Sequence, residues 1–307
     1  MENDKNMSDY ETTNADISVI LTLYKRPENL KQQLEAIENQ TLKPKEILLY
    51  QDGTGDTVKI PDEIKDRFNL IEISPENKGV WERFRFGMNN ANCEYVCVFD
   101  DDTIPGRRWL ENCMTQMTKQ EGLYVTIGIV IEDAKMCPIK SDSYFRIGWD
   151  GQLDYTAEVD YGGHSWFLKR EWLKELFKAP AEIQKLKIAG EDMSLSRQLA
   201  KKGIKTFVPP HPANNKDLYG SIPEVSSPLG DNKAALSYNG QNILNMNKGI
   251  QILIQDGWQL LAERNPGYVK KLKNGICKNF LNIITIKESF KHKTIKIFGI
   301  KMSFRKK

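Results

Sequence analysis

The chain has 307 residues, of which 40% are hydrophobic and 28% are charged, a composition typical of a soluble globular protein. This length allows one large domain with an appendage, or two modest domains. No segment approaches the roughly 20 consecutive apolar residues that a membrane-spanning helix needs, so the pattern excludes an integral membrane class. The formal net charge is only +3. The basic end of the chain could contact nucleic acid, but the sequence lacks the aromatic–basic modules of known RNA-binding proteins, so we expect no nucleic-acid partner.

The first residues and the cysteines indicate the compartment. Residues 1–14 are polar and acidic, unlike a secretory signal or a transit peptide, and we expect a flexible tail over 1–15. The five cysteines are odd in number and scattered, which fits reduced thiols better than a disulfide framework. We therefore expect a cytoplasmic protein.

From residue 17 onward, short β-rich runs alternate with segments of helical spacing. The expected strands cover residues 17–23, 46–50, 68–73, 95–99, 123–131 and 205–208. The first expected helix begins at Pro27. The later expected helices cover residues 80–90, 109–120, 191–202 and 234–264. This alternation predicts an α/β fold with a mostly parallel, Rossmann-like sheet and helices on both faces. Residues 144–166 are rich in glycine and aromatic residues and have no regular pattern.

Polar side chains follow several of the predicted strands at the point where each strand ends. Ligands of such sheets bind outside the carboxyl ends of the strands. Phe99 ends an apolar run and is followed by three carboxylates, Asp100, Asp101 and Asp102. Crowded carboxylates repel one another unless a cation lies between them, and Mg²⁺ or Mn²⁺ commonly joins such carboxylates to substrate phosphates. The sequence therefore predicts a divalent metal site here, with a solvated acidic loop as the alternative.

Six segments in order over residues 16–212 resemble the inverting, metal-dependent family 2 glycosyltransferases. They are the strand and loop at 18–27, the helix-to-strand connection at 40–46, the Asp-Gly turn at 51–56, the Asn-Lys-Gly segment at 76–80, the Gly-Gly and following segment at 162–171, and the Glu-Asp helix start at 190–197. The resemblance implies a GT-A fold and transfer of a sugar from a nucleotide-diphosphate sugar to a hydroxyl. It also implies a glycan or lipid-linked acceptor of the bacterial surface type, such as lipopolysaccharide or capsule.

The resemblance further implies a role for individual residues. Tyr24 would stack on the nucleotide base and Asp52 would accept from its ring N–H, with Thr22 beside them, which favours uracil or thymine and so a UDP-sugar. An arginine would also contact the nucleotide, either Arg83 or Arg85; we favour Arg83. Asp100 would contact the ribose or the metal, and Asp102 would contact the metal on the diphosphate. Asp101 would face the sugar or solvent.

The resemblance assigns the chemistry of transfer to the segment that follows residue 190. Asp192 would be the general base that takes the proton of the acceptor hydroxyl, although an acidic residue at a helix start is also favourable on its own. His211 would be a further metal ligand, with a surface loop histidine as the alternative. The acceptor or donor sugar would meet a set of four residues: Gly163, His164, Trp166 and Glu191.

Two other classes of protein remain to be weighed. A nucleotidyltransferase that makes nucleotide sugars would share the fold, but it would carry a glycine-rich segment after the first strand, where Tyr24 to Glu28 has none. A non-catalytic sugar-binding or membrane-binding protein would need neither the Asp triplet nor the Glu191–Asp192 pair. We therefore favour the glycosyltransferase.

The end of the chain is strongly basic. We expect a glycosyltransferase domain over 16–222, a linker and helical extension over 223–267, and a basic tail over 268–307. In that tail about a dozen Lys and Arg residues accompany a single acid, Glu288. Such a tail predicts a peripheral contact with an anionic membrane surface at the inner face of the cell membrane, with a small β-hairpin packed on the domain as the alternative.

Overall fold

A computed structural model describes residues 14–149, 152–230, 240–281, 285–288, 292–297 and 300–305. The strands, in chain order, are β1 (Asn14–Leu23), β2 (Lys43–Gln51), β3 (Leu70–Ile73), β4 (Tyr95–Phe99), β5 (Leu123–Ile131), β6 (Tyr144–Ile147), β7 (Ala157–Val159), β8 (Tyr161–Lys169), β9 (Thr206–Val208), β10 (Thr285–Glu288), β11 (His292–Ile297) and β12 (Ile300–Arg305). The α-helices are α1 (Pro27–Glu38), α2 (Asp62–Lys65), α3 (Glu82–Asn90), α4 (Trp109–Lys119), α5 (Leu173–Leu176), α6 (Ala181–Gln184), α7 (Glu191–Ala200), α8 (Pro223–Gly230), α9 (Gly240–Gln255), α10 (Leu261–Arg264) and α11 (Pro266–Leu281).

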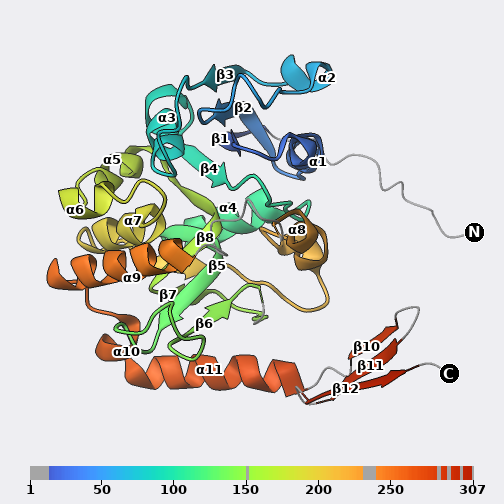
Figure 1. Ribbon diagram of the computed structural model, residues 1–307, viewed down its shortest axis with the longest axis vertical. Helices are drawn as coiled ribbons and strands as arrows, with labels where there is room; N and C mark the ends of the chain where they lie inside the picture. Colours follow the sequence, from blue (N-terminus) through green and yellow to red (C-terminus); the bar gives the residue numbers. More distant parts are fainter. Residues whose placement is uncertain are drawn as a thin grey trace, which may run out of the picture.

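A nine-stranded sheet flanked by helices forms the body of the protein, which confirms the expected α/β fold. Its order is β3-β2-β1-β4-β8-β5-β9-β7, with β6 beside β5, and Figure 1 shows it from β3 at the top to β7 near the bottom. The central strand β4 is buried at every residue from Val96 to Phe99, as expected for a strand covered on both faces. Four cysteines of the protein are free and buried, and one of them, Cys97, belongs to this strand.

The sheet is less parallel than the sequence predicts. Strands β3, β2, β1 and β4 pair in parallel, but β8 is antiparallel to both β4 and β5. The difference arises in the stretch 144–166 that showed no regular pattern, which contains β6, β7 and the start of β8. A β-bulge between Val125 and Ile127 interrupts the pairing of β5 with β8, and opposite it His164 adopts a positive φ of 68°.

The helices that follow the sheet are anchored to it by a buried carboxylate. Asp160, between β7 and β8, accepts the N–H of Ile131 at 2.8 Å and the N–H of Leu261 at 2.7 Å. This ties the start of α10 to the end of β5. Helix α11 then packs Val269, Leu272 and other apolar residues against the core, so it crosses the boundary expected at residue 268. The strands β10, β11 and β12 form a separate antiparallel sheet.

Candidate active site

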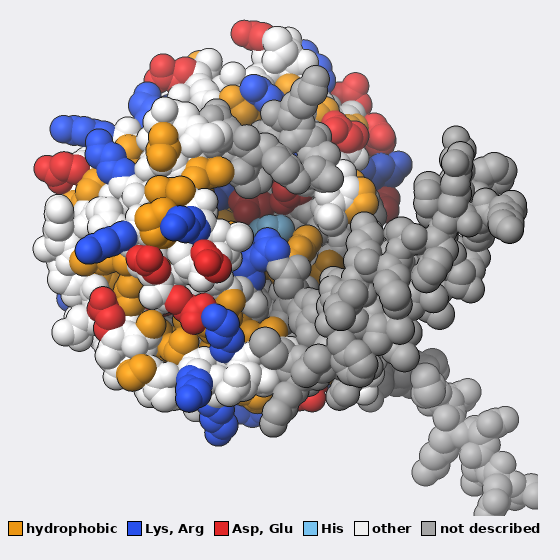
Figure 2. Space-filling model, turned by 60° about the horizontal axis from the view of Figure 1, so that its bottom comes forward, with side chains coloured by type: hydrophobic (Ala, Val, Ile, Leu, Met, Phe, Trp, Pro, Cys, Tyr) orange, Lys and Arg blue, Asp and Glu red, His pale blue; other side chains and the backbone are white. Residues whose placement is uncertain are grey.

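One cavity lies at the carboxyl ends of the parallel strands. Its volume is about 560 Å³, which is within the range of small-molecule binding sites. Figure 2 shows it as a hollow with acidic side chains and a histidine at its bottom. It brings together all but one of the residues predicted from the sequence, namely Thr22, Tyr24, Asp52, Arg83, Asp100, Asp101, Asp102, Gly163, His164, Trp166, Glu191 and Asp192.

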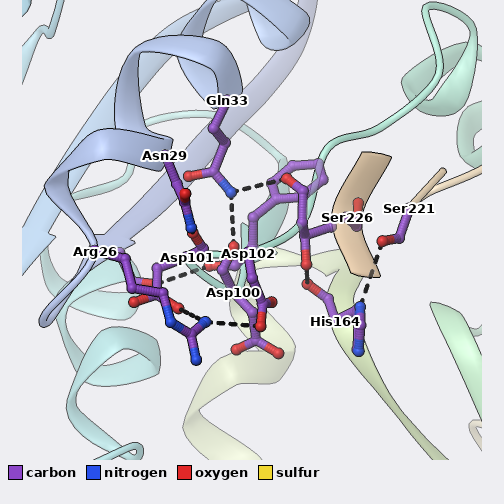
Figure 3. A network of polar contacts seen from close by, with 12 residues as sticks. Arg26, Asn29, Gln33, Asp100, Asp101, Asp102, His164, Ser221 and Ser226 are labelled. Atoms are coloured by element: carbon purple, nitrogen blue, oxygen red, sulfur yellow. Dashed lines mark hydrogen bonds and ion pairs between the residues drawn. The ribbon is translucent and has the colours of Figure 1, made fainter. Parts of the chain in front are cut away.

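The Asp triplet directly follows β4 and contacts an arginine from the start of α1. Nη1 of Arg26 lies 2.9 Å from Oδ1 of Asp101 and 2.7 Å from Oδ2 of Asp102 (Figure 3). Burial raises the pKa of Asp101 to about 7, although Arg26 acts in the opposite direction. The two carboxylates still reach the cavity, because the side chains of Asp101 and Asp102 are 20% and 19% exposed.

A second buried arginine joins the triplet to the start of α7. Arg83 of α3 donates to Oδ1 of Asp100 and, at 2.8 Å, to Oε1 of Glu191. Its guanidinium also lies over the ring of Trp166, 4.7 Å from the ring centroid. Burial raises the pKa of Glu191, against the opposing effect of Arg83. Arg83 therefore compensates the charge of two carboxylates from distant parts of the chain.

Asp192 is a carboxylate of this cavity that has no cationic partner among the described residues, as is also true of Asp52. Asp192 is half-buried in the first turn of α7, and among the described residues it forms no ion pair. Its Oδ1 accepts the N–H of Met193 at 2.7 Å. Burial, followed by the charge of Glu191, raises the pKa of Asp192 well above its usual range. An unpaired carboxylate with a raised pKa holds a proton more readily, as a general base requires.

The backbone before Asp192 depends on a glycine. Gly190 has a φ of 95°, a region that residues with a side chain rarely adopt. A Cβ at this position would also lie 2.8 Å from the side chain of Ile183. Gly190 therefore lets the chain turn sharply into α7 and places Asp192 at the cavity.

Asp52 lines the cavity and follows the end of β2. Its carboxylate accepts the N–H of Lys78 at 2.8 Å and the N–H of Gly79 at 3.0 Å, so it also fixes the turn after Asn77. Its Oδ1 also accepts the hydroxyl of Tyr50 at 3.3 Å. A carboxylate accepts about four hydrogen bonds, so these three leave capacity for one further donor. Thr22 donates to the carbonyl of Phe99 at 3.0 Å, which joins the ends of β1 and β4.

Another wall of the cavity is formed around His164 of β8, the residue with the positive φ. The carbonyl of His164 accepts the N–H of Asp100 at 2.9 Å and the hydroxyl of Thr103 at 3.1 Å. Its ring lies 5.0 Å from that of Trp149, and Nδ1 is 3.4 Å from the hydroxyl oxygen of Ser221 (Figure 3). A positive φ in a residue other than glycine costs of order 1–3 kcal/mol and is found mainly at functional sites.

The four residues expected near the sugar fall into two pairs. Trp166 and Glu191 are buried in the wall and contact Arg83, so neither presents an open face to a ligand. Gly163 and His164 are half-buried, and the space beside the Cα of Gly163 is open. Only this second pair is placed to contact a sugar directly.

His211 is the one predicted site residue that the structure keeps out of the cavity. It is buried between the rings of Trp109 and Tyr219, at centroid distances of 5.7 Å and 4.8 Å. Nδ1 lies 2.8 Å from the carbonyl of Pro209, and Nε2 accepts the N–H of Gly220 at 3.4 Å. Because both ring nitrogens have partners inside the protein, His211 presents no free nitrogen to a metal in this structure.

We expect His211→Gln to change stability but not metal dependence. Burial lowers the pKa of His211 to about 4, whereas a histidine in the unfolded chain titrates near 6.5. The unfolded state therefore binds the proton more tightly, and the wild type loses stability as the pH falls from 6.5 to 4. Urea unfolding across this pH range should show a smaller loss of stability in the variant than in the wild type. A changed Mn²⁺ titration curve would contradict the structural assignment.

Several lining residues were not predicted from the sequence. Besides Arg26 and Arg146, they include residues of α8, which was expected to be part of a linker, and of α9: Ser226, Ser227, Gly230, Asn242 and Met246. Gly230 approaches Asp102 so closely that a Cβ would lie 2.7 Å from Oδ2. The glycines and serines of this segment were the available signal, since small residues permit close approach to a ligand or carboxylate.

The side chains of the cavity supply only some of the ligands that a divalent ion needs. In the described part of the chain, no three His, Cys, Asp or Glu side chains converge as a complete metal site. Asp101 and Asp102 nevertheless supply hard oxygen ligands, and Arg26 already occupies the position of a cation between them. Mg²⁺ and related ions are commonly held by one or two carboxylates together with substrate phosphates and water. The donor set therefore fits a metal that arrives with a diphosphate.

The cavity lies at the carboxyl ends of the strands, which is where open α/β sheets usually bind their ligands. The model of glycosyl transferase family 2 matches residues 18–177, just over half of the chain. The chain therefore belongs to this family and is a glycosyltransferase. This confirms the resemblance seen in the sequence and sets aside the nucleotidyltransferase and the non-catalytic binding protein.

Similar proteins include other glycosyltransferases. A cholesterol galactosyltransferase from Borreliella burgdorferi is 25% identical over 249 residues, which cover 76% of this chain and 68% of that protein. An uncharacterized glycosyltransferase from Haemophilus influenzae is 26% identical over 134 residues, covering 42% of this chain and 41% of that one. A solved mannosyltransferase from Pyrobaculum calidifontis, in complex with GDP-mannose and Mn²⁺, has a TM-score of 0.45 at 15% identity and covers 86% of this chain and 81% of its own.

Proposed function

We propose that the protein is an inverting glycosyltransferase that uses a nucleotide-diphosphate sugar, with Asp192 as the general base. The observation that carries the proposal is the unpaired, half-buried carboxylate of Asp192 in the same cavity as the Asp triplet. The acceptor hydroxyl oxygen forms a bond to the anomeric carbon while the bond to the diphosphate oxygen breaks. The bonding electrons leave with the diphosphate, and the hydroxyl proton passes to Asp192.

The other residues of the cavity bind and orient the donor in this proposal. Tyr24 and Asp52 hold the base, which favours uracil or thymine, and Asp100 and Asp102 face the ribose and diphosphate. A bound Mn²⁺ or Mg²⁺ would neutralise the charge that develops on the leaving diphosphate. Arg83 lines the same cavity and pairs with Asp100, so it would hold this carboxylate in place for the donor.

A donor screen tests this function. UDP-, dTDP- and GDP-sugars are added to the full chain with Mn²⁺, and the melting temperature and sugar transfer are measured. We expect stabilisation by the uracil or thymine donors and its loss in EDTA, because a ligand that binds only the folded state raises the melting temperature. A chain that no donor stabilises, with or without Mn²⁺, would contradict the proposal.

We propose further that the acceptor is a glycan or lipid-linked hydroxyl at an anionic membrane. The relative from Borreliella burgdorferi is named for transfer to cholesterol, a membrane lipid, which supports this choice. None of the described helices has the length and apolarity to cross a bilayer. Helix α11 buries its apolar side against the core, while Lys270 and Lys271 are exposed. Much of the basic tail, including the side chains after residue 276, lies outside the described residues.

Charge reversal on α11 tests the membrane contact. Each lysine near an anionic bilayer contributes about 1 kcal/mol, so Lys270→Glu with Lys271→Glu should weaken binding to phosphatidylserine vesicles by roughly 2 kcal/mol or more, about thirtyfold. The matched control reverses Lys31 and Lys119, which are exposed on α1 and α4. Vesicle flotation measures both variants at two salt concentrations. Equal flotation of the two variants would remove α11 from the membrane surface.

A further inference from the structure

Helix α1 carries a polar stripe on a buried side. Arg26 precedes the helix, and Asn29 and Gln33 follow at spacings of three and four residues, so all three side chains lie on one face. Gln33 is 0% exposed. A helix packed on a sheet normally buries apolar side chains on this face, so a polar stripe requires specific partners.

The partners of this stripe are the backbone and side chains of the Asp triplet, as Figure 3 shows. Nε2 of Gln33 donates to the carbonyl of Asp100 at 2.6 Å and to that of Thr103 at 2.9 Å. Nδ2 of Asn29 donates to the carbonyl of Asp101 at 3.1 Å. The stripe therefore fixes the turn that presents the three carboxylates to the cavity.

Arg26 completes the stripe by binding the carboxylates themselves. A single nitrogen, Nη1, bridges Asp101 and Asp102, and the residue is only 7% exposed. The following Pro27 begins α1 and disfavours a helical backbone at Arg26, which has a φ of −126° and a ψ of 63°. The guanidinium is thus held between two carboxylates that would otherwise repel each other.

The bridge is also part of the cavity wall. Arg26, Asp101 and Asp102 all line the cavity, so a cation that enters from solvent meets carboxylates that already have a positive partner. The guanidinium of Arg26 and an entering metal cation cannot both occupy the space between the two carboxylates. Coulomb repulsion between them is substantial at such short range, even at an effective dielectric constant near 20.

We propose that Arg26 is an internal counter-cation that competes with the divalent ion for Asp102 and yields to it only when the donor diphosphate binds. The inference rests on the proposed function, because it needs a metal–diphosphate ligand in this cavity. Released from Asp102, the guanidinium is free to pair with phosphate oxygens, which arginine binds with two parallel hydrogen bonds. Arg26 thereby couples metal binding to donor binding and is a positioning residue for the carboxylates in the free enzyme.

The coupling has a measurable sign. Removing a positive side chain should tighten Mn²⁺ binding in the absence of nucleotide, which is the reverse of what loss of a structural residue would do. Couplings between ligands in proteins commonly amount to factors of 5–150, so we expect Arg26→Gln to bind Mn²⁺ roughly tenfold more tightly than the wild type. By reciprocity, the enhancement of Mn²⁺ affinity by a nucleoside diphosphate should shrink by a similar factor.

The experiment titrates Mn²⁺ into the full chain and follows free Mn²⁺ by electron paramagnetic resonance, with and without UDP or GDP. Arg67→Gln is the matched control, since Arg67 forms its ion pair with Glu38 outside the cavity, and its Mn²⁺ affinity should equal that of the wild type. Weaker or unchanged Mn²⁺ binding by Arg26→Gln overturns the inference.

A second variant covers the case in which Arg26→Gln does not fold. Arg26→Lys keeps one positive charge but presents it as a point charge that cannot reproduce the fork of arginine. We expect an intermediate gain in Mn²⁺ affinity, and no gain overturns the inference. A wild type that binds neither nucleoside diphosphate with Mn²⁺ contradicts the proposed function itself, so the two failures are distinguishable.

Discussion

Asp192→Asn is expected to lower sugar transfer by roughly 10² to 10⁴-fold, the contribution of a general base. Donor affinity should be retained, because the diphosphate would be held at the Asp triplet and not at the start of α7. Asn is nearly the same size as Asp and also favours helix starts, so the fold should persist. Initial rates at saturating donor measure the effect. Asp142→Asn, at an exposed position outside the cavity, is the control.

The same substitution should not lower the stability of the protein at neutral pH. Burial and the charge of Glu191 raise the pKa of Asp192 in the folded state, so ionisation costs stability as the pH rises above its unfolded value. A neutral Asn removes this cost, and the melting temperature should equal or exceed that of the wild type. For the same reason, activity of the wild type should fall on the acid side at a pH above the usual range of an aspartate. Transfer within a few-fold of the wild type would exclude Asp192 as the base.

Arg83→Leu is expected to destabilise the fold by about 3–5 kcal/mol, the usual result of removing one partner from a buried ion pair. Arg83 is 11% exposed and holds both Asp100 and Glu191. Without it, two carboxylates from β4 and α7 would face each other without a counter-charge. Urea unfolding, analysed at constant slope, measures the loss.

Arg85→Leu is the matched control for this prediction. Arg85 lies two residues further along the same helix, is 42% exposed and pairs with Glu82. Exposed ion pairs contribute about 0–1 kcal/mol, so the control should lose little. Equal losses in the two variants would mean that the charge bridge of Arg83 does not stabilise the fold.

The sequence predicted the parallel half of the sheet better than the other half. Strands β4 and β5 have the predicted bounds, because each is a continuous apolar run closed by polar residues. Strand β8 was missed because its Gly162-Gly163-His164 segment lacks apolar alternation and two adjacent glycines usually mark a turn. Its bulge at His164 depends on a positive φ that no sequence pattern shows.

The site residues that directly follow strands could be predicted from the sequence. Asp52 and Asp100 directly follow strands, and parallel strands end at one edge, so their approach could be inferred. His211 also follows a strand, but the aromatic rings that enclose it come from α4 and from the segment before α8. The role of Arg26 depends on a contact across 75 residues of sequence, and nothing local to Arg26 indicates its partners.

The stereochemistry of transfer tests the central claim most directly. A single displacement assisted by Asp192 reverses the configuration at the anomeric carbon, whereas a mechanism through a covalent glycosyl-enzyme retains it. Proton NMR of the first product formed, recorded with the donor and Mn²⁺ before any spontaneous change of configuration, reads the anomeric coupling constant. We predict a configuration opposite to that of the donor sugar. A product with the configuration of the donor would contradict the direct displacement and the role of Asp192 as its base.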